Sequence, residues 1–441
     1  MASPEKGPDR PALARLARGF RERTWVTARL TAKAGLKALA AQGRPSRRDG
    51  KELDRAKAVE AAVRLARDVE GLKGLMMKVG QMASYLDPSL PPEARQVLST
   101  LQAGSQPMAF EAIDEVLREE LGAPAAELFD SFEPEPFAAA SIGQVHRARH
   151  EDRELAVKVQ YPGIEEAIRS DLDTVSTLAR IGSVGMALDT VEVFAELRER
   201  LAAECDYEAE ARYQRAFAEL LEGFPGASAP SVVAERSSRR VLSSSFAPGM
   251  SFQSFCDSAA QDDKDRAGAL IFDVCYSSIH QRCLYNADPH PGNYLFTSEG
   301  EVTFLDFGCV KELPLEMIML WKRIARSVLS GHRRRFQEAV LETGMVARPD
   351  RFDWDHHWKV MLYIYEPFMT EGFRFTHDYV RRSYDLMLWD NPNTRHMTFP
   401  RTWLWVNRLQ WGLNSVLAHL EAAGPWPELW RAAIEAEVVE E

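Results

Sequence analysis

The sequence lacks the features of a disulfide-stabilised or membrane-spanning protein. Its five cysteines are an odd number without a C-x-x-C spacing, which suits neither a disulfide framework nor a structural zinc site. No window reaches the roughly eighteen uninterrupted apolar residues of a spanning helix; the closest, residues 175–194, contains three charged side chains. The start of the chain also lacks a secretory apolar core. We therefore expect a protein of a reducing compartment, cytoplasmic and either soluble or attached to a membrane surface.

Outside the first fifty residues, acidic side chains outnumber basic ones. The formal charge of the chain is −11, yet residues 1–50 hold 12 Lys or Arg against 4 Asp or Glu, so they carry +8 and the remainder −19. Because phosphate neutralisation needs a basic surface, nucleic acid is excluded as the general partner. Apolar residues recur at helical intervals within 13–39, which suits an anionic membrane surface or an organellar presequence. A solvated flexible extension is the third interpretation.

Residues 286–308 contain two carboxylates and an amide at the spacing that phosphoryl transfer requires. Asp288 stands five residues before Asn293, and Asp306 begins a D-F-G triplet. In kinases the first Asp positions the nucleophile, while the Asn and the D-F-G Asp hold Mg²⁺. Apolar runs at 294–296 and 301–305 flank a polar turn and predict a β-hairpin that brings Asn293 beside Asp306. The alternative is a proline-rich turn in which these side chains only cap backbone amides.

A lysine inside an apolar strand is the second candidate for phosphate chemistry. Residues 155–160 fit the V-A-I-K pattern, in which the strand delivers one Lys, here Lys158, to the α- and β-phosphates. A buried Lys costs desolvation unless it meets anions, which favours a functional role. The usual partner is a helix Glu, and the helix predicted over 191–221 offers Glu204 and Glu208 on one face and Glu210 on another.

The segment that would cover the phosphates is rich in alanine instead of glycine. Ala138, Ala139, Ala140 and Ser141 stand where kinases have a Gly-rich loop, within a predicted strand, turn and strand over 138–148. Alanine still admits a close backbone but removes flexibility. Only a few residues separate the D-F-G triplet from the next predicted helix, and no A-P-E follows. We therefore do not expect a peptide substrate.

An amphipathic helix is predicted over 54–86, where apolar residues recur at three- and four-residue spacing. Lys78 and Gln81 are three residues apart and point from one face; by themselves they also fit an ordinary solvated face. Further helices are expected at 110–121 and 265–281, the latter with His280 as a core or boundary residue. The remaining expectations are a helical hairpin within 164–187, a strand pair at 231–235 and 239–246, and a predominantly helical chain after Gly308.

Five motifs occur in one order along residues 55–430. They are Lys78-x-Gly80-Gln81, the alanine-rich loop, Glu204-Cys205-Asp206-Tyr207-x-x-Glu210, Asp288-Pro289-His290-Pro291-Gly292-Asn293 and the Asp306 triplet. In these motifs the chain resembles the UbiB family of atypical kinases, also called AarF-domain or ADCK kinases. Asn286 stands where ordinary kinases have a catalytic-loop His, and the spanning helix of many relatives is not found in this sequence.

The resemblance implies an α+β, bilobal protein-kinase-like fold with an added N-terminal helical KxGQ layer and a largely helical C-lobe. A chain of this size and hydrophobicity can form such lobes. The expected division is a basic extension at 1–50, the KxGQ segment at 51–108, an N-lobe with a helical insertion at 109–247, and a C-lobe at 248–441.

The resemblance also implies an Mg²⁺-dependent kinase or ATPase that uses ATP (or ADP) and supports ubiquinone or other isoprenoid-lipid metabolism beside lipid-biosynthesis enzymes. The mitochondrial matrix is then the alternative compartment. Carried over by motif, Lys158 contacts phosphates and pairs with Glu204, Asn293 and Asp306 hold the metal, and Asp288 orients the nucleophile. Lys78 and Gln81 lie over the pocket, with Glu210 as a partner for Lys78.

Two other functions stay open at this point. Aminoglycoside phosphotransferases and choline kinases use a similar Asp-x-x-x-x-Asn loop and also lack A-P-E, but they have no KxGQ element. The other alternative is a nucleotide-gated scaffold that binds partners and turns nothing over. Nucleotide binding without phosphate release above an Asp306→Asn control would favour the scaffold.

Overall fold

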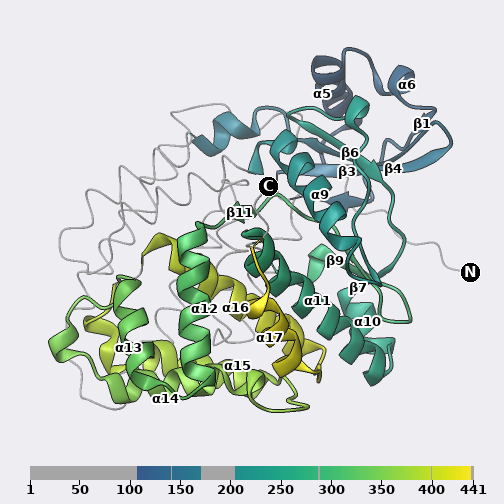
Figure 1. Cartoon of the computed structure of the whole chain (residues 1–441). Helices are drawn as coiled ribbons and strands as arrows, with labels where there is room; N and C mark the ends of the chain where they lie inside the picture. Colours follow the sequence, from purple (N-terminus) through teal and green to yellow (C-terminus); the bar gives the residue numbers. More distant parts are fainter. Residues whose placement is uncertain (1–106, 141, 170–203, 287–288, 399, 439–441) are drawn as a thin grey trace, which may run out of the picture. The chain divides into compact units, whose positions relative to one another are not determined.

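The computed structural model describes residues 107–140, 142–169, 204–286, 289–398 and 400–438 (Figure 1). The chain forms two compact units. Among the described residues, the first unit contains those up to 208 and 232–246, and the second unit contains 209–231 and those from 247 onward. Lys78, Gln81, Ser141 and Asp288 lie outside the described residues, as do residues 1–50. The domain boundaries expected from the sequence stay predictions.

The first unit is built on an antiparallel sheet whose longest strands are β3 (Gly143–His150) and β4 (Arg153–Gln160). The strand order is β1-β3-β4-β6, with β1 at Ser131–Phe132, β6 at Val241–Ser245, and β2 (Ala138–Ala139) paired with β3. The β3–β4 turn consists of Glu151 and Asp152, both with positive φ. The predicted strand, turn and strand at 138–148 and the lysine strand are confirmed.

Side chains along β4 point alternately to an apolar face and to a polar face of the sheet. Leu155, Val157 and Val159 are buried in a core shared with α5 (Phe110–Leu121), while Lys158 and Gln160 point from the other face. The bounds of α5 agree with the prediction, and the helix ends at Gly122, whose positive φ completes a left-handed cap. A short helix, α6 (Ala125–Leu128), follows it.

The strand predicted at 231–235 is wrong in part. Only Val232 forms a bridge, to Ser244, and Ala234–Arg236 forms the 3₁₀ turn η1. The hydroxyl of Ser237 donates to the Val233 carbonyl at 2.7 Å and accepts from the Ser243 amide at 3.0 Å. A side chain therefore takes the backbone partners that a second strand would need.

The second unit is mainly helical, as predicted for the chain after Gly308. Its longest helices are α11 (Gln261–Arg282), α12 (Leu315–Leu329) and α16 (Arg401–His419). Shorter helices of this unit include α10 (Phe252–Ser258), α13 (Arg333–Glu342), α14 (Trp354–Ile364), α15 (His377–Tyr384) and α17 (Trp426–Glu435), with the π-helical turn η5 (Asp385–Trp389) and the 3₁₀ turns η3 (Pro349–Arg351), η4 (Glu366–Phe368) and η6 (Pro392–Arg395); most of α9 (Tyr207–Leu221) also belongs to it.

Two small sheets complete this unit. One has the order β5-β10-β9-β7, with β5 at Ala227–Ser228 and β7 at Met250–Ser251. The other pairs β8 (Leu284–Asn286) with β11 (Val310–Glu312), a strand that the sequence reading missed. The helix predicted at 265–281 is α11, which begins four residues earlier.

Aromatic rings fill the centre of the second unit. Trp430 stacks on Phe368 with ring centroids 4.5 Å apart and meets Tyr276 edge-on at 4.6 Å. His280, predicted as a core or boundary residue, is a core residue: it is fully buried, with its ring centroid 4.9 Å from that of Trp321. None of the helices in the described part of the chain is long and apolar enough to cross a bilayer.

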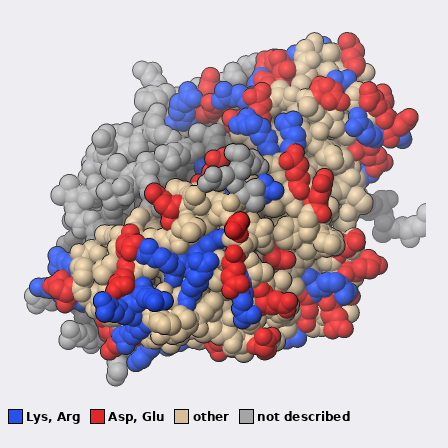
Figure 2. All heavy atoms as spheres, viewed as in Figure 1, with Lys and Arg blue, Asp and Glu red and all other residues tan. Residues whose placement is uncertain are grey.

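Charges of both signs alternate over the helices of the second unit (Figure 2). Arg334 pairs with Glu338 at 3.0 Å, and Arg323 pairs with Glu342 at 2.6 Å. Ion pairs of this exposed kind contribute little stability. On the face that Figure 2 shows, the described residues of this unit therefore present a mixed surface and not an extended basic one.

Candidate nucleotide and metal site

The predicted hairpin is confirmed, and it brings the two candidate metal ligands to one end. Strands β9 (Tyr294–Phe296) and β10 (Val302–Phe304) pair antiparallel, with Tyr294 opposite Phe304. Beyond that pair, the Leu305 amide donates to the Asn293 carbonyl at 2.9 Å. Asn293 ends the 3₁₀ turn η2 (Pro291–Asn293), and Asp306 directly follows Leu305.

The backbone around Asp306 is fixed by two side-chain hydrogen bonds. Its own Oδ1 accepts from the Gly308 amide at 2.9 Å, which makes a local turn. Its carbonyl accepts from Nδ2 of Asn286 at 2.8 Å. Asn286 is the residue that replaces the usual catalytic-loop His. Here it ties the end of β8 to the D-F-G triplet, a role that sequence reasoning missed.

Phe307 anchors the triplet in the core of the second unit. It is fully buried, and its ring lies 5.3 Å from that of Phe217 on α9 (Tyr207–Leu221). Nearer the start of α9, Glu210 is also buried. A Cβ atom added to Gly308 would lie 3.3 Å from Asp306 Oδ1 and 3.4 Å from Glu210 Oε2. Two carboxylates therefore flank Gly308, and a side chain there would crowd both of them.

Lys158 in the first unit lies over an aromatic ring. Its Nζ is 4.8 Å from the ring centroid of Tyr207, a cation–π distance. On the same strand face, Gln160 donates from Nε2 to the carbonyls of Cys205 at 2.9 Å and Arg239 at 3.3 Å. The strand that carries Lys158 is thus attached to the turn that follows Glu204.

The helix predicted over 191–221 is interrupted within the described residues. Cys205 and Asp206 are not helical, and α9 begins at Tyr207. The Cys205 carbonyl accepts from Gln160, and the Tyr207 amide donates to the Arg239 carbonyl at 3.0 Å, so these groups bond outside the helix. The expectation that Glu204 and Glu208 share one helix face is therefore wrong: Glu204 is buried and Glu208 is exposed.

The alanine-rich loop is held by backbone pairing. Ala139 pairs with Gln144 across β2 and β3, and the Ala140 amide donates to the Gly143 carbonyl at 2.9 Å. Gly143 is required here, because a Cβ would lie 2.2 Å from the Val159 carbonyl oxygen. Ala138 and Ala139 are exposed. Their methyl groups limit the backbone freedom that glycines would give.

A buried polar network lies directly behind this loop. Gln144 accepts through Oε1 from the Met108 amide at 2.8 Å, and its Nε2 lies 2.9 Å from Nε2 of His146. Nδ1 of His146 is 2.8 Å from the Glu133 carbonyl. Since a carbonyl only accepts, Nδ1 carries the proton and Nε2 accepts from Gln144. Burial lowers the pKa of His146, which keeps the ring neutral.

Sequence reasoning missed this network, although a signal was present. Gln144 and His146 are polar residues at alternate positions of a strand, on the face that packs against the apolar core of the first unit. Buried polar side chains are nearly always hydrogen-bonded, so such a pair predicts a network.

The oxygen donors at the end of the hairpin suit Mg²⁺. Asn293 offers an amide oxygen and Asp306 a carboxylate, the hard ligands that Mg²⁺ prefers, with water and phosphate oxygens completing its shell. Among the described residues, no three His, Cys, Asp or Glu side chains are grouped to hold a metal by themselves.

Comparison with known proteins supplies the family. The family model described as the ABC1 atypical kinase-like domain matches residues 100–340. The chain is 32% identical over 285 residues to the mitochondrial atypical kinase coq-8 of Caenorhabditis elegans, covering 62% of this chain and 37% of that protein. It is also 32% identical over 320 residues to the mitochondrial atypical kinase COQ8B of Rattus norvegicus, covering 70% and 60%.

A solved structure agrees with these matches over most of the chain. The Rv3197–erythromycin complex from Mycobacterium tuberculosis aligns with a TM-score of 0.64 and 28% identity, covering 86% of this chain and 97% of that one. The chain spans 37% and 60% of the length of the two kinases named above. The five motifs, the α+β fold and these matches agree, and the chain belongs to the ABC1 atypical kinase-like family, the UbiB family of COQ8 and ADCK kinases.

Proposed function

We propose that this protein is an Mg²⁺-nucleotide-dependent atypical kinase or ATPase that supports ubiquinone or other isoprenoid-lipid metabolism. The observation that carries the proposal is the Asp306 turn: the Gly308 amide and Asn286 fix it beside Asn293 at the end of one hairpin. Ligands held in this way need no reorganisation when a metal–nucleotide complex binds. The family membership supports the same conclusion.

Each site residue has one role in the proposal. Asn293 and Asp306 hold Mg²⁺, which neutralises phosphate charge when it is bound. Asp288 orients or deprotonates the nucleophile, which is water or a small hydroxyl compound. Lys158 contacts the phosphates with Glu204 as its partner, and the turn attached through Gln160 supports that pairing. Lys78 and Gln81 cover the pocket with Glu210, and the backbone of the loop Ala138, Ala139, Ala140 and Ser141 approaches the phosphates.

Phosphate release by the full chain tests the activity. Asp306→Asn keeps the size of the side chain and an acceptor for the Gly308 amide but removes the charge that the metal needs. We expect ATP hydrolysis to fall about 100-fold or more, as for other groups that stabilise a transition state. Asp350→Asn is the matched control, because Asp350 is exposed on η3. Equal hydrolysis by the wild type and Asp306→Asn would contradict the proposal.

The alanine-rich loop allows a second test of the same site. Ala139 is exposed and pairs only through its backbone, so Ala139→Gly leaves the packing intact and frees the loop. We expect a changed preference between ATP and ADP or a changed rate of self-phosphorylation. Identical binding and labelling in the variant would remove the loop from the proposed site.

The physiological role and the location are tested in cells and with vesicles. Because both kinases named above are called mitochondrial, the mitochondrial matrix is the proposed compartment alongside a cytoplasmic, membrane-surface location. Deletion of the gene should change quinone or isoprenoid-lipid profiles, and unchanged profiles would exclude that pathway.

Flotation with anionic liposomes, with and without residues 1–50, tests whether their +8 charge binds membranes.

Macrolide binding is a second candidate function. The Mycobacterium tuberculosis protein in the aligned complex binds erythromycin, and this chain covers 97% of that protein. Isothermal titration of the full chain with erythromycin tests whether this property is shared. Absence of binding heat at millimolar ligand would remove the candidate and leave the proposed kinase activity unaffected.

A further inference from the structure

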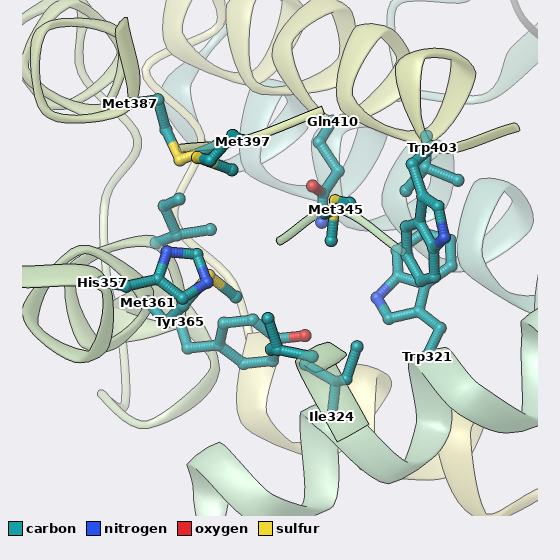
Figure 3. A pocket seen from close by; sticks show the side chains of 13 residues that line it. Trp321, Ile324, Met345, His357, Met361, Tyr365, Met387, Met397, Trp403 and Gln410 are labelled. Carbon is teal, nitrogen blue, oxygen red and sulfur yellow. The ribbon is translucent and has the colours of Figure 1, made fainter. Parts of the chain in front are cut away.

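A cavity of about 60 Å³ lies among the helices of the second unit (Figure 3). Four of the 14 methionines of the chain line it, with two tryptophans and several aliphatic side chains. The lining residues come from α12, α13, α14, α16 and η5 and from the segments between them. They are Trp321, Ile324, Val340, Met345, His357, Met361, Ile364, Tyr365, Met387, Met397, Trp403, Val406 and Gln410.

Three uncharged polar side chains face this cavity. His357 is 5% exposed and its ring points inward in Figure 3. Burial lowers its pKa to about 4, so the imidazole is neutral at physiological pH. Tyr365 and Gln410 bring a phenol hydroxyl and a carboxamide to the same cavity. A neutral imidazole, a phenol hydroxyl and a carboxamide can each donate and accept a hydrogen bond.

The lining defines the chemistry of an occupant. Since no charged side chain is among the described residues that line the cavity, a charged ligand would be buried without a counter-ion. Thioether and indole walls favour an apolar body, and the polar group of His357, Tyr365 and Gln410 suits one neutral hydrogen-bonding head. The volume is below the about 150 Å³ of a cavity that admits benzene, and flexible methionines let such a cavity adapt.

Local backbone geometry adds a second observation. Met387 belongs to η5, which has π-helical geometry over Asp385–Trp389. A π-helical turn is less regular than an α-helix and occurs frequently at functional sites. Here it places one of the four methionines into the wall of the cavity.

Helix α16 connects the cavity to the loop at 288–293, which carries the proposed catalytic Asp288 and is called the catalytic loop below. Trp403, Val406 and Gln410 line the cavity, and Gly412 lies two residues further along the same helix. A Cβ atom at Gly412 would be 2.5 Å from Cγ of Pro289, the residue directly after Asp288. The backbone of α16 therefore contacts the catalytic loop with no room for a methyl group, and a shift of α16 must move Pro289.

We propose that the methionine-lined cavity binds a small neutral molecule with a short alkyl body and one hydroxyl or carbonyl head, and that α16 transmits its occupancy to the catalytic loop. This site is separate from the residues assigned to nucleotide and metal, and it adds a regulatory ligand to the proposed function. Binding and its effect on the loop can both be measured without nucleotide.

The binding experiment uses the full chain labelled with ¹³C at the methionine methyl groups. The probe is 3-methylbutan-1-ol, and the charged control is 3-methylbutanoate. We expect saturable shifts at Met345, Met361, Met387 and Met397 with the alcohol only. Met319 and Met369, which are 50% and 43% exposed, should not move. Equal shifts at exposed and lining methionines, or none at the lining ones, would overturn the proposal.

Two variants on α16 separate cavity filling from a general effect. Val406→Leu adds a methylene inside the cavity and should weaken alcohol binding about tenfold, which corresponds to about 1.4 kcal/mol. Val416→Leu makes the same change at a buried position of the same helix outside the cavity and should leave binding unchanged. Equal weakening by the two variants would contradict binding in this cavity.

Amide exchange tests the connection to the catalytic loop. The Asn293 amide donates to the His290 carbonyl at 2.9 Å and reports on the loop backbone. We expect a saturating alcohol to change its exchange rate about fivefold, the lower range of allosteric coupling. Binding without any change at Asn293 would overturn the proposed link and leave a ligand site only.

Discussion

The two units differ in how far packing helps to hold their site residues. In the first unit, the strands around Lys158 and the alanine-rich loop are attached by hydrogen bonds of two buried side chains, from Gln160 to Cys205 and from Gln144 to Met108 and His146. In the second unit, Phe307 packs on Phe217, and Gly412 lies against Pro289. Hydrogen bonds of buried side chains hold the strands of the first unit, whereas in the second unit close packing of rings and backbone adds to the two hydrogen bonds that fix Asp306.

The difference predicts different weaknesses. A hydrogen-bonded attachment fails when one partner is removed, because the group left behind is buried and unpaired. A packed core fails when volume is lost, because the neighbours relax only partly. The two units can be followed separately, since nine of the ten tryptophans lie in the second unit and the remaining one is Trp25. Tryptophan fluorescence therefore reports the second unit, and far-ultraviolet circular dichroism reports both.

Loss of a central ring should have the largest effect. Trp430→Ala removes a fully buried side chain that contacts Tyr276, Trp321 and Phe368. We expect the free energy of unfolding of the second unit to fall by about 3–5 kcal/mol, measured by denaturant titration with fluorescence. Met369→Ala, at a 43% exposed position of the same unit, should change it by less than about 0.5 kcal/mol. Equal effects of the two variants would contradict a packing-dominated unit.

Removal of the Gln144 carboxamide should have the second-largest effect, and it should act on the first unit. Gln144→Leu removes the partner of the part-buried Met108 amide and of the buried Nε2 of His146. We expect a loss of about 2–3 kcal/mol in the dichroism transition. The fluorescence transition should stay in place. The control is Arg149→Gln at an exposed position of the same strand, and a fluorescence shift as large as the dichroism shift would show that the units do not respond separately.

Acid should weaken the packed unit through His280. Burial lowers the pKa of His280 to about 3, and the ordinary value applies in the unfolded chain. The unfolded state therefore binds a proton as the pH falls below about 6.5 while the folded state does not, so stability is lost between about pH 6.5 and 3. The loss from this residue between pH 7 and 5 is about 2 kcal/mol.

The variant His280→Leu separates this contribution from other titrating groups. Neither ring nitrogen of His280 has a hydrogen-bond partner among the described residues, so leucine leaves no described group unpaired. Between pH 7 and 5, the free energy of unfolding of the variant, followed by fluorescence, should fall by about 2 kcal/mol less than that of the wild type. His332→Ala, at an exposed position, should retain the full dependence. An unchanged pH profile in His280→Leu would exclude His280 as the cause.

An ion pair in the first unit should have the smallest effect. Arg240 contacts Glu120 at 2.6 Å and Glu119 at 2.7 Å and is 28% exposed. Removing its charge with Arg240→Gln should cost about 0.5–1 kcal/mol, and added salt should reduce the difference. The more exposed pair of Arg118 with Asp114 is the comparison, and Arg118→Gln should cost less. A larger loss from Arg118→Gln would reverse this ranking.

Several elements could be predicted because their signals are local. The bounds of α5 follow from helical periodicity and Gly122, and the β9–β10 hairpin follows from two apolar runs around a polar turn. The strand of Lys158 follows from apolar alternation. The missed features depend on partners far along the chain. The break before Tyr207 requires groups at Gln160 and Arg239, and no pattern near Tyr207 contains them.

The sequence by itself determined the family, the α+β kinase-like fold and the order of residues that carry the proposed chemistry, because motif identity and spacing are properties of one continuous chain. The tertiary structure decided how those residues are held. Only the fold shows Asn286 bonded to the Asp306 carbonyl, Gln144 bonded to Met108, and Gly412 packed on Pro289. These contacts join segments 20, 36 and 123 residues apart, and the physical reason is that packing and hydrogen bonding depend on distance in space and not on separation along the chain.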